Sequence, residues 1–157
     1  MAWTNSKIFR QYLADVLGNT TAMDLNSDTF KAALYDNDIT PSQTAASAST
    51  AFNAGQWATA GNEVADGAEW ATGGIALSSV TSGFSSNVYT FDAADTVSTG
   101  SSATLANVYG CLVYDDTITT PVADQGVCYN YFGGANSVTD GTFTIAWSAS
   151  GIFAITA

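Results

Sequence analysis

The chain has 157 residues, the length of one ordinary domain, and can bury about two thirds of the surface that its unfolded form exposes. Hydrophobic residues make up 46% of it, which excludes intrinsic disorder, and no window approaches the roughly 18 unbroken apolar residues of a membrane-spanning helix. The formal net charge is −11, from 14 acidic and 3 basic residues. We therefore expect a soluble globular protein that binds neither nucleic acid nor a membrane.

Histidine is absent from the chain. Its absence excludes Ser-His-Asp and Cys-His catalysis, as well as zinc and iron sites built from imidazole. The sequence has no glycine-rich phosphate-binding motif, and Arg10 is its only arginine, which argues against phosphoryl transfer. Two carboxylates would suffice for a glycosidase, but no acidic cluster lies in an aromatic context. We expect a non-enzymatic protein without a cofactor.

The first predicted element is an amphipathic helix over about residues 5–17. Its apolar residues recur at the i, i+3, i+4 spacing of one helix face, Asn5 or Ser6 would cap it, and Gly18 would end it. The start of the chain lacks the apolar core of a signal peptide, so we expect synthesis and assembly in a cytoplasm. This helix and a connector form residues 1–27, ahead of a β domain over residues 28–157.

The hydrophobic period changes to two at the start of the β domain. Phe30, Ala32 and Leu34 alternate with residues of the other face, which predicts a half-buried strand. The segment 42–56, rich in Ser, Thr and Ala, leaves a short helix and a surface loop equally open. The sequence predicts further strands at residues 75–80, 88–91, 105–115, 126–132, 142–147 and 152–156. Turn residues separate these strands at short intervals, which predicts a mainly β fold: an antiparallel β-sandwich or barrel-like domain with an N-terminal amphipathic α-helix.

Cys111 and Cys128 lie on two neighbouring predicted strands. If these strands pair as a hairpin centred near residue 119 or 120, the two cysteines oppose each other on one face, and a disulfide is geometrically possible. Directly opposed residues are often too constrained for good disulfide geometry, and free cysteine is among the most buried residue types. Two reduced core thiols are therefore favoured, and a bond formed later outside the cell stays open.

Two groups of residues invite a ligand-binding interpretation. Asp115, Asp116 and Asp124 surround the turn of this hairpin and could supply oxygen ligands to Ca²⁺, although aspartate is common at turns and the EF-hand pattern is absent. The tryptophans of the β domain suggest sugar stacking, since aromatic residues make up 12% of the chain. These are Trp57, Trp70 and Trp147. Core packing is the stronger interpretation of these rings, and we expect no metal.

The basic residues Lys7, Arg10 and Lys31 all lie in the first 31 residues, where they balance three acids. Residues 32–157 carry the other eleven acids and neither lysine nor arginine. The apolar face of the N-terminal helix has two alternative roles: it packs on the β domain, which is the usual outcome, or it docks on a partner. A partner of residues 32–157 is therefore not bound by cationic side chains of that part.

Four segments resemble, in this order along the chain, a group of small β-rich virion structural proteins of tailed bacteriophages. The segments are DTFKAALYD (28–36), WATGG (70–74), ANVYGCLVYDD (106–116) and GTFTIAW (141–147). The first, third and fourth segments are similar to the early strand, the central strand and the C-terminal strand of that group, and the resemblance covers about residues 28–157. The cysteine pair departs from the group's pattern.

The resemblance implies a capsid decoration (cement) protein that binds the outer surface of the major capsid protein lattice, stabilises the head and self-associates, with a trimer favoured. A tail or other minor virion protein is one alternative, and a carbohydrate-binding module for host attachment is another. The acidic body suits a protein present in many copies, because like charges repel one another and DNA. Contacts to the capsid or to a neighbouring copy are expected from Trp3, Lys7, Phe9, Arg10 and Lys31.

Overall fold

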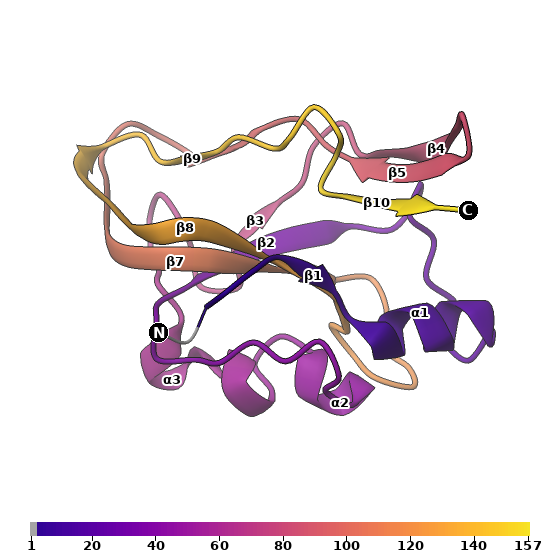
Figure 1. The fold of residues 1–157 in the computed structure, drawn as a ribbon. Helices are drawn as coiled ribbons and strands as arrows, with labels where there is room; N and C mark the ends of the chain where they lie inside the picture. The colour runs from indigo at the N-terminus through magenta and orange to yellow at the C-terminus, as the bar shows by residue number, and fades with distance from the viewer. Residues whose placement is uncertain (1–2) are drawn as a thin grey trace.

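The computed structural model describes residues 3–157, which fold into three stacked layers (Figure 1). A five-stranded sheet forms the middle layer. Two smaller sheets cover one of its faces, and short helices cover the other. The fold is mainly β, with antiparallel sheets packed together in a sandwich-like arrangement, which confirms the predicted fold class.

The middle sheet has the strand order β1-β8-β7-β2-β3, and each neighbouring pair is antiparallel. Its strands are β1 (Lys7–Ile8), β2 (Phe30–Tyr35), β3 (Ile75–Ala76), β7 (Ala103–Asp115) and β8 (Gly126–Gly141). The long hairpin of β7 and β8 forms the centre of this sheet. The sequence predicted β2 and β7 closely, whereas β8 continues well beyond its predicted end at residue 132.

The second layer consists of a three-stranded and a two-stranded sheet. The first has the order β10-β5-β4 and the second pairs β6 with β9. Their strands are β4 (Thr81–Ser85), β5 (Val88–Asp92), β6 (Thr96–Val97), β9 (Thr144–Ile145) and β10 (Phe153–Thr156). The sequence analysis predicted β5, β9 and β10 but not β4, whose Ser and Gly residues carry little hydrophobic pattern.

The third layer contains the helices. They are α1 (Arg10–Leu17), α2 (Ser47–Thr50), a 3-10 turn η1 (Gly55–Trp57) and α3 (Thr59–Asn62). The segment 42–56 is therefore neither a single helix nor a bare loop, because short helical turns alternate in it with extended residues. No helix among residues 3–157 has both the length and the apolar character needed to cross a membrane.

Both faces of the middle sheet are buried. On β2, Phe30 packs against Phe91 of β5 with 5.1 Å between ring centroids, while Tyr35 packs against Trp57 on the helical side at 5.0 Å. Ala32, Ala33, Leu34 and Tyr35 are all 0% exposed. The predicted half-buried strand is thus wrong in one respect, because this strand belongs to a central layer and is covered on both sides.

The N-terminal segment begins as an extended arm, residues 3–9, that pairs with the middle sheet. The predicted helix over residues 5–17 is wrong in its first part, since β1 pairs with β8 and the helix starts only at Arg10. Phe9 is extended, with φ −67° and ψ 132°, and its N–H donates to the carbonyl oxygen of Val127 at 3.1 Å. Pairing with β8 satisfies the backbone groups that a longer helix would otherwise bond internally. Gly18 ends the helix as predicted.

The arm also places the side chain of Trp3 in the core. Trp3 is 0% exposed, lies across Gly110 of β7 and donates its indole N–H to the carbonyl oxygen of Asp36 at 2.6 Å. A Cβ atom on Gly110 would come within 2.6 Å of the Trp3 ring, so only glycine leaves room for this contact. Residues from the N-terminal part and from the β domain therefore share one core.

We expect Trp3→Ala to lower the free energy of unfolding by about 3–5 kcal/mol, because it empties a fully buried site over Gly110. Urea unfolding followed by circular dichroism measures the change. Lys7→Ala on the same arm is the matched control, since the Lys7 side chain is exposed and its loss should change stability by less than about 0.5 kcal/mol. Equal stability of the two variants would show that the arm does not contribute to the core.

Candidate functional site

Two of the five residues predicted to contact a partner are buried inside the chain. The side chains of Trp3 and Phe9 are both 0% exposed. Phe9 packs against Tyr129 with 5.3 Å between ring centroids, and Trp3 packs against Trp57 at 5.9 Å. Their prediction as interface residues is therefore wrong, because aromatic contacts within the chain already cover both rings.

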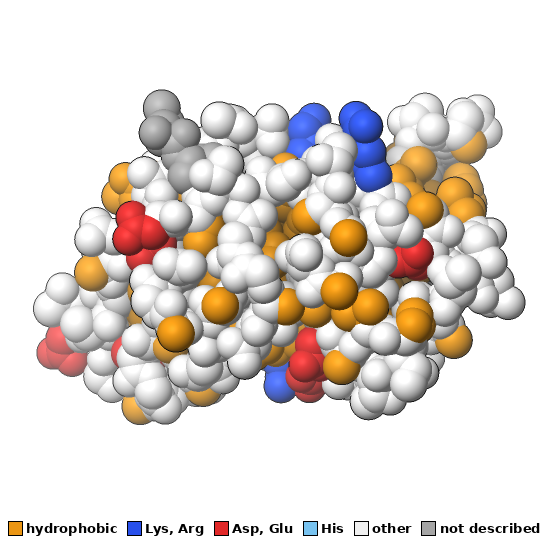
Figure 2. All heavy atoms as spheres, turned by 90° about the horizontal axis from the view of Figure 1, so that it is seen from below, with side chains coloured by type: hydrophobic (Ala, Val, Ile, Leu, Met, Phe, Trp, Pro, Cys, Tyr) orange, Lys and Arg blue, Asp and Glu red, His pale blue; other side chains and the backbone are white. Residues whose placement is uncertain are grey.

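The three basic side chains lie in two separate places. Lys31 pairs with Asp116, with 2.9 Å between Nζ and Oδ2. Figure 2 shows two basic side chains side by side at one edge of the molecule and a third at the opposite edge beside an acidic side chain. Lys7 and Arg10 are exposed, and neither forms an ion pair within residues 3–157. These two residues remain available to a partner, whereas Lys31 is partly neutralised.

Cys111 and Cys128 are both free and buried. Cys111 lies opposite Asn130, and Cys128 lies opposite Val113. The two cysteines share a face as predicted, but they are diagonal neighbours, since the register differs by two residues from the predicted pairing. An irregularity at Val127 adds one residue to β8 near the turn, and the sequence pattern does not reveal such a bulge.

The acidic residues at the turn of the hairpin do not converge on a common point. Asp115 is 0% exposed, and its Oδ1 accepts the backbone N–H of Thr117 at 2.8 Å. Asp116 instead pairs with Lys31. Among residues 3–157, no group of three Asp, Glu, Cys or His side chains is arranged to hold a metal ion, so the calcium interpretation has no ligand set there.

Burial raises the pKa of Asp115 to about 7, and the neighbouring charge of Asp28 adds to the rise. The N–H groups of Thr117 and Ile118 act in the opposite direction, because they donate hydrogen bonds to the ionised carboxylate. Asp115 is thus an acid whose protonation is tied to folding. Its backbone bonds show that it closes the strand, so its role is structural.

The tryptophans considered for sugar stacking differ in how far they are buried. Trp57 and Trp70 are 0% exposed and pack in the core, Trp70 against Phe143 with 5.6 Å between centroids. Their indole N–H groups are buried without a hydrogen-bond partner in the described structure. Trp147 is only half-buried and lines a hollow. Only Trp147 is therefore placed to meet a ligand.

One end of the molecule presents apolar side chains. Leu17 at the end of α1 is 85% exposed, and Phe84 of β4 is 69% exposed. Figure 1 shows the end of α1 and the β4–β5 hairpin at the same end of the molecule, close to the C-terminus. Between them lies a hollow of about 450 Å³. We call this the apolar end surface and define it by Val16, Leu17, Met23, Leu25, Phe84 and Tyr89.

The apolar end surface is held together by contacts between its parts. Phe84 packs edge-on against Tyr89 with 5.1 Å between ring centroids, and the Tyr89 hydroxyl donates to Ser82 at 2.9 Å. Ser82 in turn donates to Asn26 of the connector at 2.9 Å. The sequence analysis missed Phe84 because it did not predict β4, and no local signal marks a phenylalanine that stays exposed.

A second candidate site is a groove at the open edge of the sandwich. It joins two hollows of about 570 and 510 Å³ that share Ser6, Asn130 and Ile152. One wall is the β1–β8 edge of the middle sheet, and the other is the C-terminal segment with β9 and β10. Among residues 3–157, no acidic residue lines either hollow, and Lys7 is the only charged residue that does. We call this the open-edge groove.

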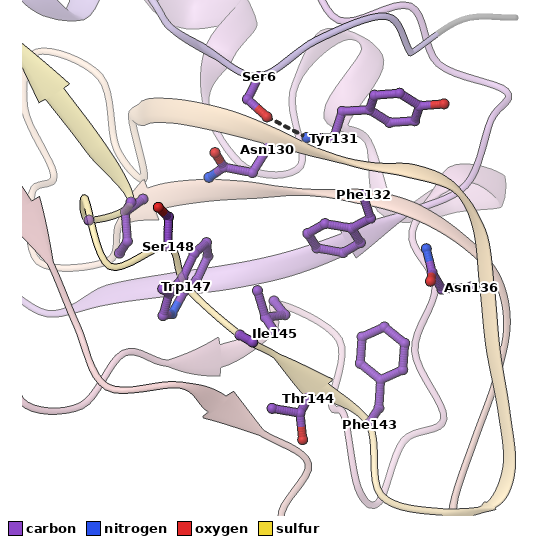
Figure 3. Close-up of a pocket in the computed structure, with 13 residues that line it drawn as sticks. Ser6, Asn130, Tyr131, Phe132, Asn136, Phe143, Thr144, Ile145, Trp147 and Ser148 are labelled. Carbon is purple, nitrogen blue, oxygen red and sulfur yellow. Dashed lines mark hydrogen bonds between the residues drawn. The ribbon is translucent and has the colours of Figure 1, made fainter.

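Aromatic and aliphatic side chains form the interior of this groove. Figure 3 shows Phe132 projecting from β8 toward the segment that carries Ile145 and Trp147, with Phe143 below it. Tyr131 points away from the cavity in the same view. Polar side chains surround the rings: Ser6, Asn130, Asn136, Thr144 and Ser148. The groove thus combines aromatic faces with neutral hydrogen-bonding groups.

The comparisons with known proteins give no relative. No protein-family model, no curated protein and no solved structure matches this chain. The two surfaces described above therefore rest on the geometry of this chain alone.

We expect the free energy of unfolding to fall as the pH rises from about 4 to about 7. Asp115 binds its proton more tightly in the folded chain, so this stabilisation is complete below the unfolded pKa of 3.8 and is lost as the pH passes through about 7. Asp115→Asn keeps an acceptor for the N–H of Thr117. It should make the fall in the free energy of unfolding between pH 4 and pH 7 smaller by about 1–3 kcal/mol. Urea unfolding at several pH values measures the free energy of unfolding of both proteins.

The control for this experiment is Asp140→Asn, which changes an exposed carboxylate on the far part of the hairpin. It should leave the pH profile close to that of the unaltered protein. An Asp115→Asn profile that keeps the full slope would contradict the assignment of Asp115 as the titrating group.

We expect both thiols to resist modification in the folded protein. Burial raises the pKa of Cys128 to about 12 and raises that of Cys111 well above its ordinary value, so little reactive thiolate forms. The aromatic disulfide reagent DTNB should react at least about 100-fold more slowly than in guanidinium chloride. Ser101→Cys places an exposed thiol on the same chain as a positive control. Rapid release of two equivalents from the native protein would refute the buried assignment.

Proposed function

We propose that this chain is a non-enzymatic structural protein of a bacteriophage virion, a capsid decoration (cement) protein on the outer surface of the head. The observation that carries the proposal is the apolar end surface, where Leu17 and Phe84 are 85% and 69% exposed. Exposed large apolar side chains that gather at one end are typical of a protein-docking surface. The occupant we propose is the major capsid protein lattice.

The physical requirements of a cement protein are area and shape rather than chemistry. Covering the side chains of Leu17 and Phe84 on a partner removes apolar surface from water and contributes about 1.5–3 kcal/mol for each fully buried side chain. Many copies bind to one lattice, so the small binding free energy of each copy adds to that of its neighbours. A modest contact per copy therefore suffices to stabilise a head.

The charge distribution supports the same function. The chain carries a net charge of −11, and neither Lys7 on β1 nor Arg10 at the start of α1 forms an ion pair within residues 3–157. Like-charge repulsion keeps free copies apart and away from DNA. In the proposed assembly, Lys7 and Arg10 supply the attraction to the acidic surface of a neighbouring copy, which supports the proposed self-association.

The N-terminal helix keeps a role in this proposal through different residues. Its last turn presents Leu17, whereas Phe9 ahead of the helix is buried and stabilises the fold. The resemblance of residues 28–157 to small β-rich virion proteins, in the segments quoted above, is consistent with this proposal. Docking through the end of the helix leaves the core undisturbed.

The direct test is binding to heads of the tailed phage that encodes this chain, prepared without the protein. We expect the unaltered protein to saturate these heads and the double variant Leu17→Ala/Phe84→Ala to bind at least about tenfold more weakly. Sedimentation with heads followed by quantitative gel electrophoresis measures occupancy. Val97→Ala is the matched control, because Val97 is another exposed large apolar residue and lies on β6.

Three outcomes would overturn the proposal. A chain encoded outside any phage genome would exclude a virion role, and purification of the protein with tails would favour the alternative of a tail component. Full occupancy of heads by the Leu17→Ala/Phe84→Ala variant, with Val97→Ala equally bound, would remove the apolar end surface as the docking site. Circular dichroism checks that each variant is folded.

A further inference from the structure

We propose that the open-edge groove binds a neutral saccharide, with the ring of Phe132 and the indole of Trp147 as its stacking surfaces. This site is separate from the apolar end surface and goes beyond the proposed decoration role. The larger hollow measures about 570 Å³, within the range of sites that hold small organic ligands. Its residues come from the arm, from β8 and from the C-terminal segment.

The alternation of β8 places Phe132 in the groove. Successive side chains of a strand point to opposite faces, so Cys128, Asn130 and Phe132 share one face, and Tyr129 and Tyr131 share the other. The two tyrosines lie on the helical side, since both pack against Trp3. Phe132 has no such partner ring within the described residues, and Figure 3 shows it directed into the cavity.

Trp147 is held in place on the opposite wall. Its indole N–H donates to the Thr96 hydroxyl at 3.1 Å, and its backbone N–H donates to Asp95 at 3.1 Å. These bonds fix the ring while the side chain stays half-exposed toward the groove. A ring fixed in advance loses little freedom on binding, and its flat face suits the C–H face of a pyranose.

The polar groups around the rings have hydrogen-bonding capacity left over. Ser6 and Ser148 each accept a backbone N–H, from Tyr131 at 2.9 Å and from Ser150 at 3.1 Å, so each hydroxyl proton can be donated to a ligand. Asn136 donates its amide protons to the carbonyl oxygens of Gly134 and Val108, which leaves Oδ1 as an acceptor.

This mixture of donors and acceptors matches the hydroxyl groups of a sugar. Each sugar hydroxyl both donates and accepts, so it pairs with serine protons and with asparagine oxygens on the same rim. An aliphatic ligand would leave these groups without partners at a cost in free energy. The groove is therefore better suited to a saccharide than to a hydrocarbon chain.

The charge of the lining selects the class of saccharide. The chain carries 14 acidic residues, yet none of them lines either hollow of the groove. The larger hollow, which holds Phe132 and Trp147, has no charged lining residue of either sign, and Lys7 lines only the smaller hollow, so a charged ligand finds no counter-charge beside the two rings. The remaining class is neutral, such as a disaccharide of hexoses or N-acetylhexosamines.

The test is a titration of the full-length protein with maltose, lactose and chitobiose, followed by ¹H–¹⁵N NMR. We expect saturable shifts at groove residues with at least one of these sugars and a dissociation constant in the millimolar range. Phe132→Leu retains apolar volume but lacks the ring face, and it should weaken binding about tenfold. Phe84→Leu is the matched control, because it removes an exposed ring outside the groove.

A second variant and a charged ligand sharpen the result. Ser148→Arg alters an exposed rim position and should block entry without disturbing the core. Sialyllactose should bind more weakly than lactose, since it is anionic. The proposal fails if all three neutral sugars give no saturable shifts, if the shifts lie outside the groove, or if Phe132→Leu and Ser148→Arg both bind as well as the unaltered protein. The head-binding experiment does not depend on these outcomes, because it tests Leu17 and Phe84 instead.

Discussion

Burial of both faces of the middle sheet is the constraint on which the rest of this structure depends. Strands β2, β7 and β8 carry large side chains on both sides, so neither face can remain in water without exposing a large apolar area. The small sheets cover one face through contacts such as Phe30 with Phe91. The arm and the short helices cover the other, where Trp57 lies among several aromatic rings. The N-terminal segment and the β domain therefore share one core.

The positions of the two candidate surfaces depend on where the small sheets, the arm and the helices stop covering the middle sheet. The small sheets and the middle sheet do not close on each other, so the β1–β8 edge and the C-terminal segment leave the open-edge groove between them. The apolar end surface lies where α1 ends at Gly18 and the β4–β5 hairpin extends beyond the sheet. Because the two surfaces use different residues, a protein docked through one keeps the other available.

Charge separates these surfaces from the remainder of the molecule. Most acidic residues lie outside them, at turns and strand ends, where several accept backbone N–H groups. Asp24 is the acidic residue that lines the hollow of the apolar end surface. The groove contains no acid, and the apolar end surface is defined by uncharged side chains. Lys7 lines the smaller hollow of the groove, and it and Arg10 form no ion pair within residues 3–157. Two surfaces with few charged lining residues thus lie on a molecule with a net charge of −11.

The sequence by itself determined the local elements and the exclusions. Hydrophobic alternation predicted β2, β5, β7 and β10, Gly18 predicted the end of the helix, and the absence of histidine removed whole classes of catalysis. These features depend on neighbouring residues or on composition, so they can be read along the chain.

Tertiary structure alone decided which faces are covered and which residues meet. Trp3 and Phe9 resemble exposed anchors in sequence, but pairing of the arm with β8 buries them. The groove brings Ser6 together with Phe132 and Trp147, residues far apart in the chain that share no local pattern. Whether an apolar side chain contacts core or solvent is set by long-range packing, because the hydrophobic effect depends on area and has no direction along the sequence.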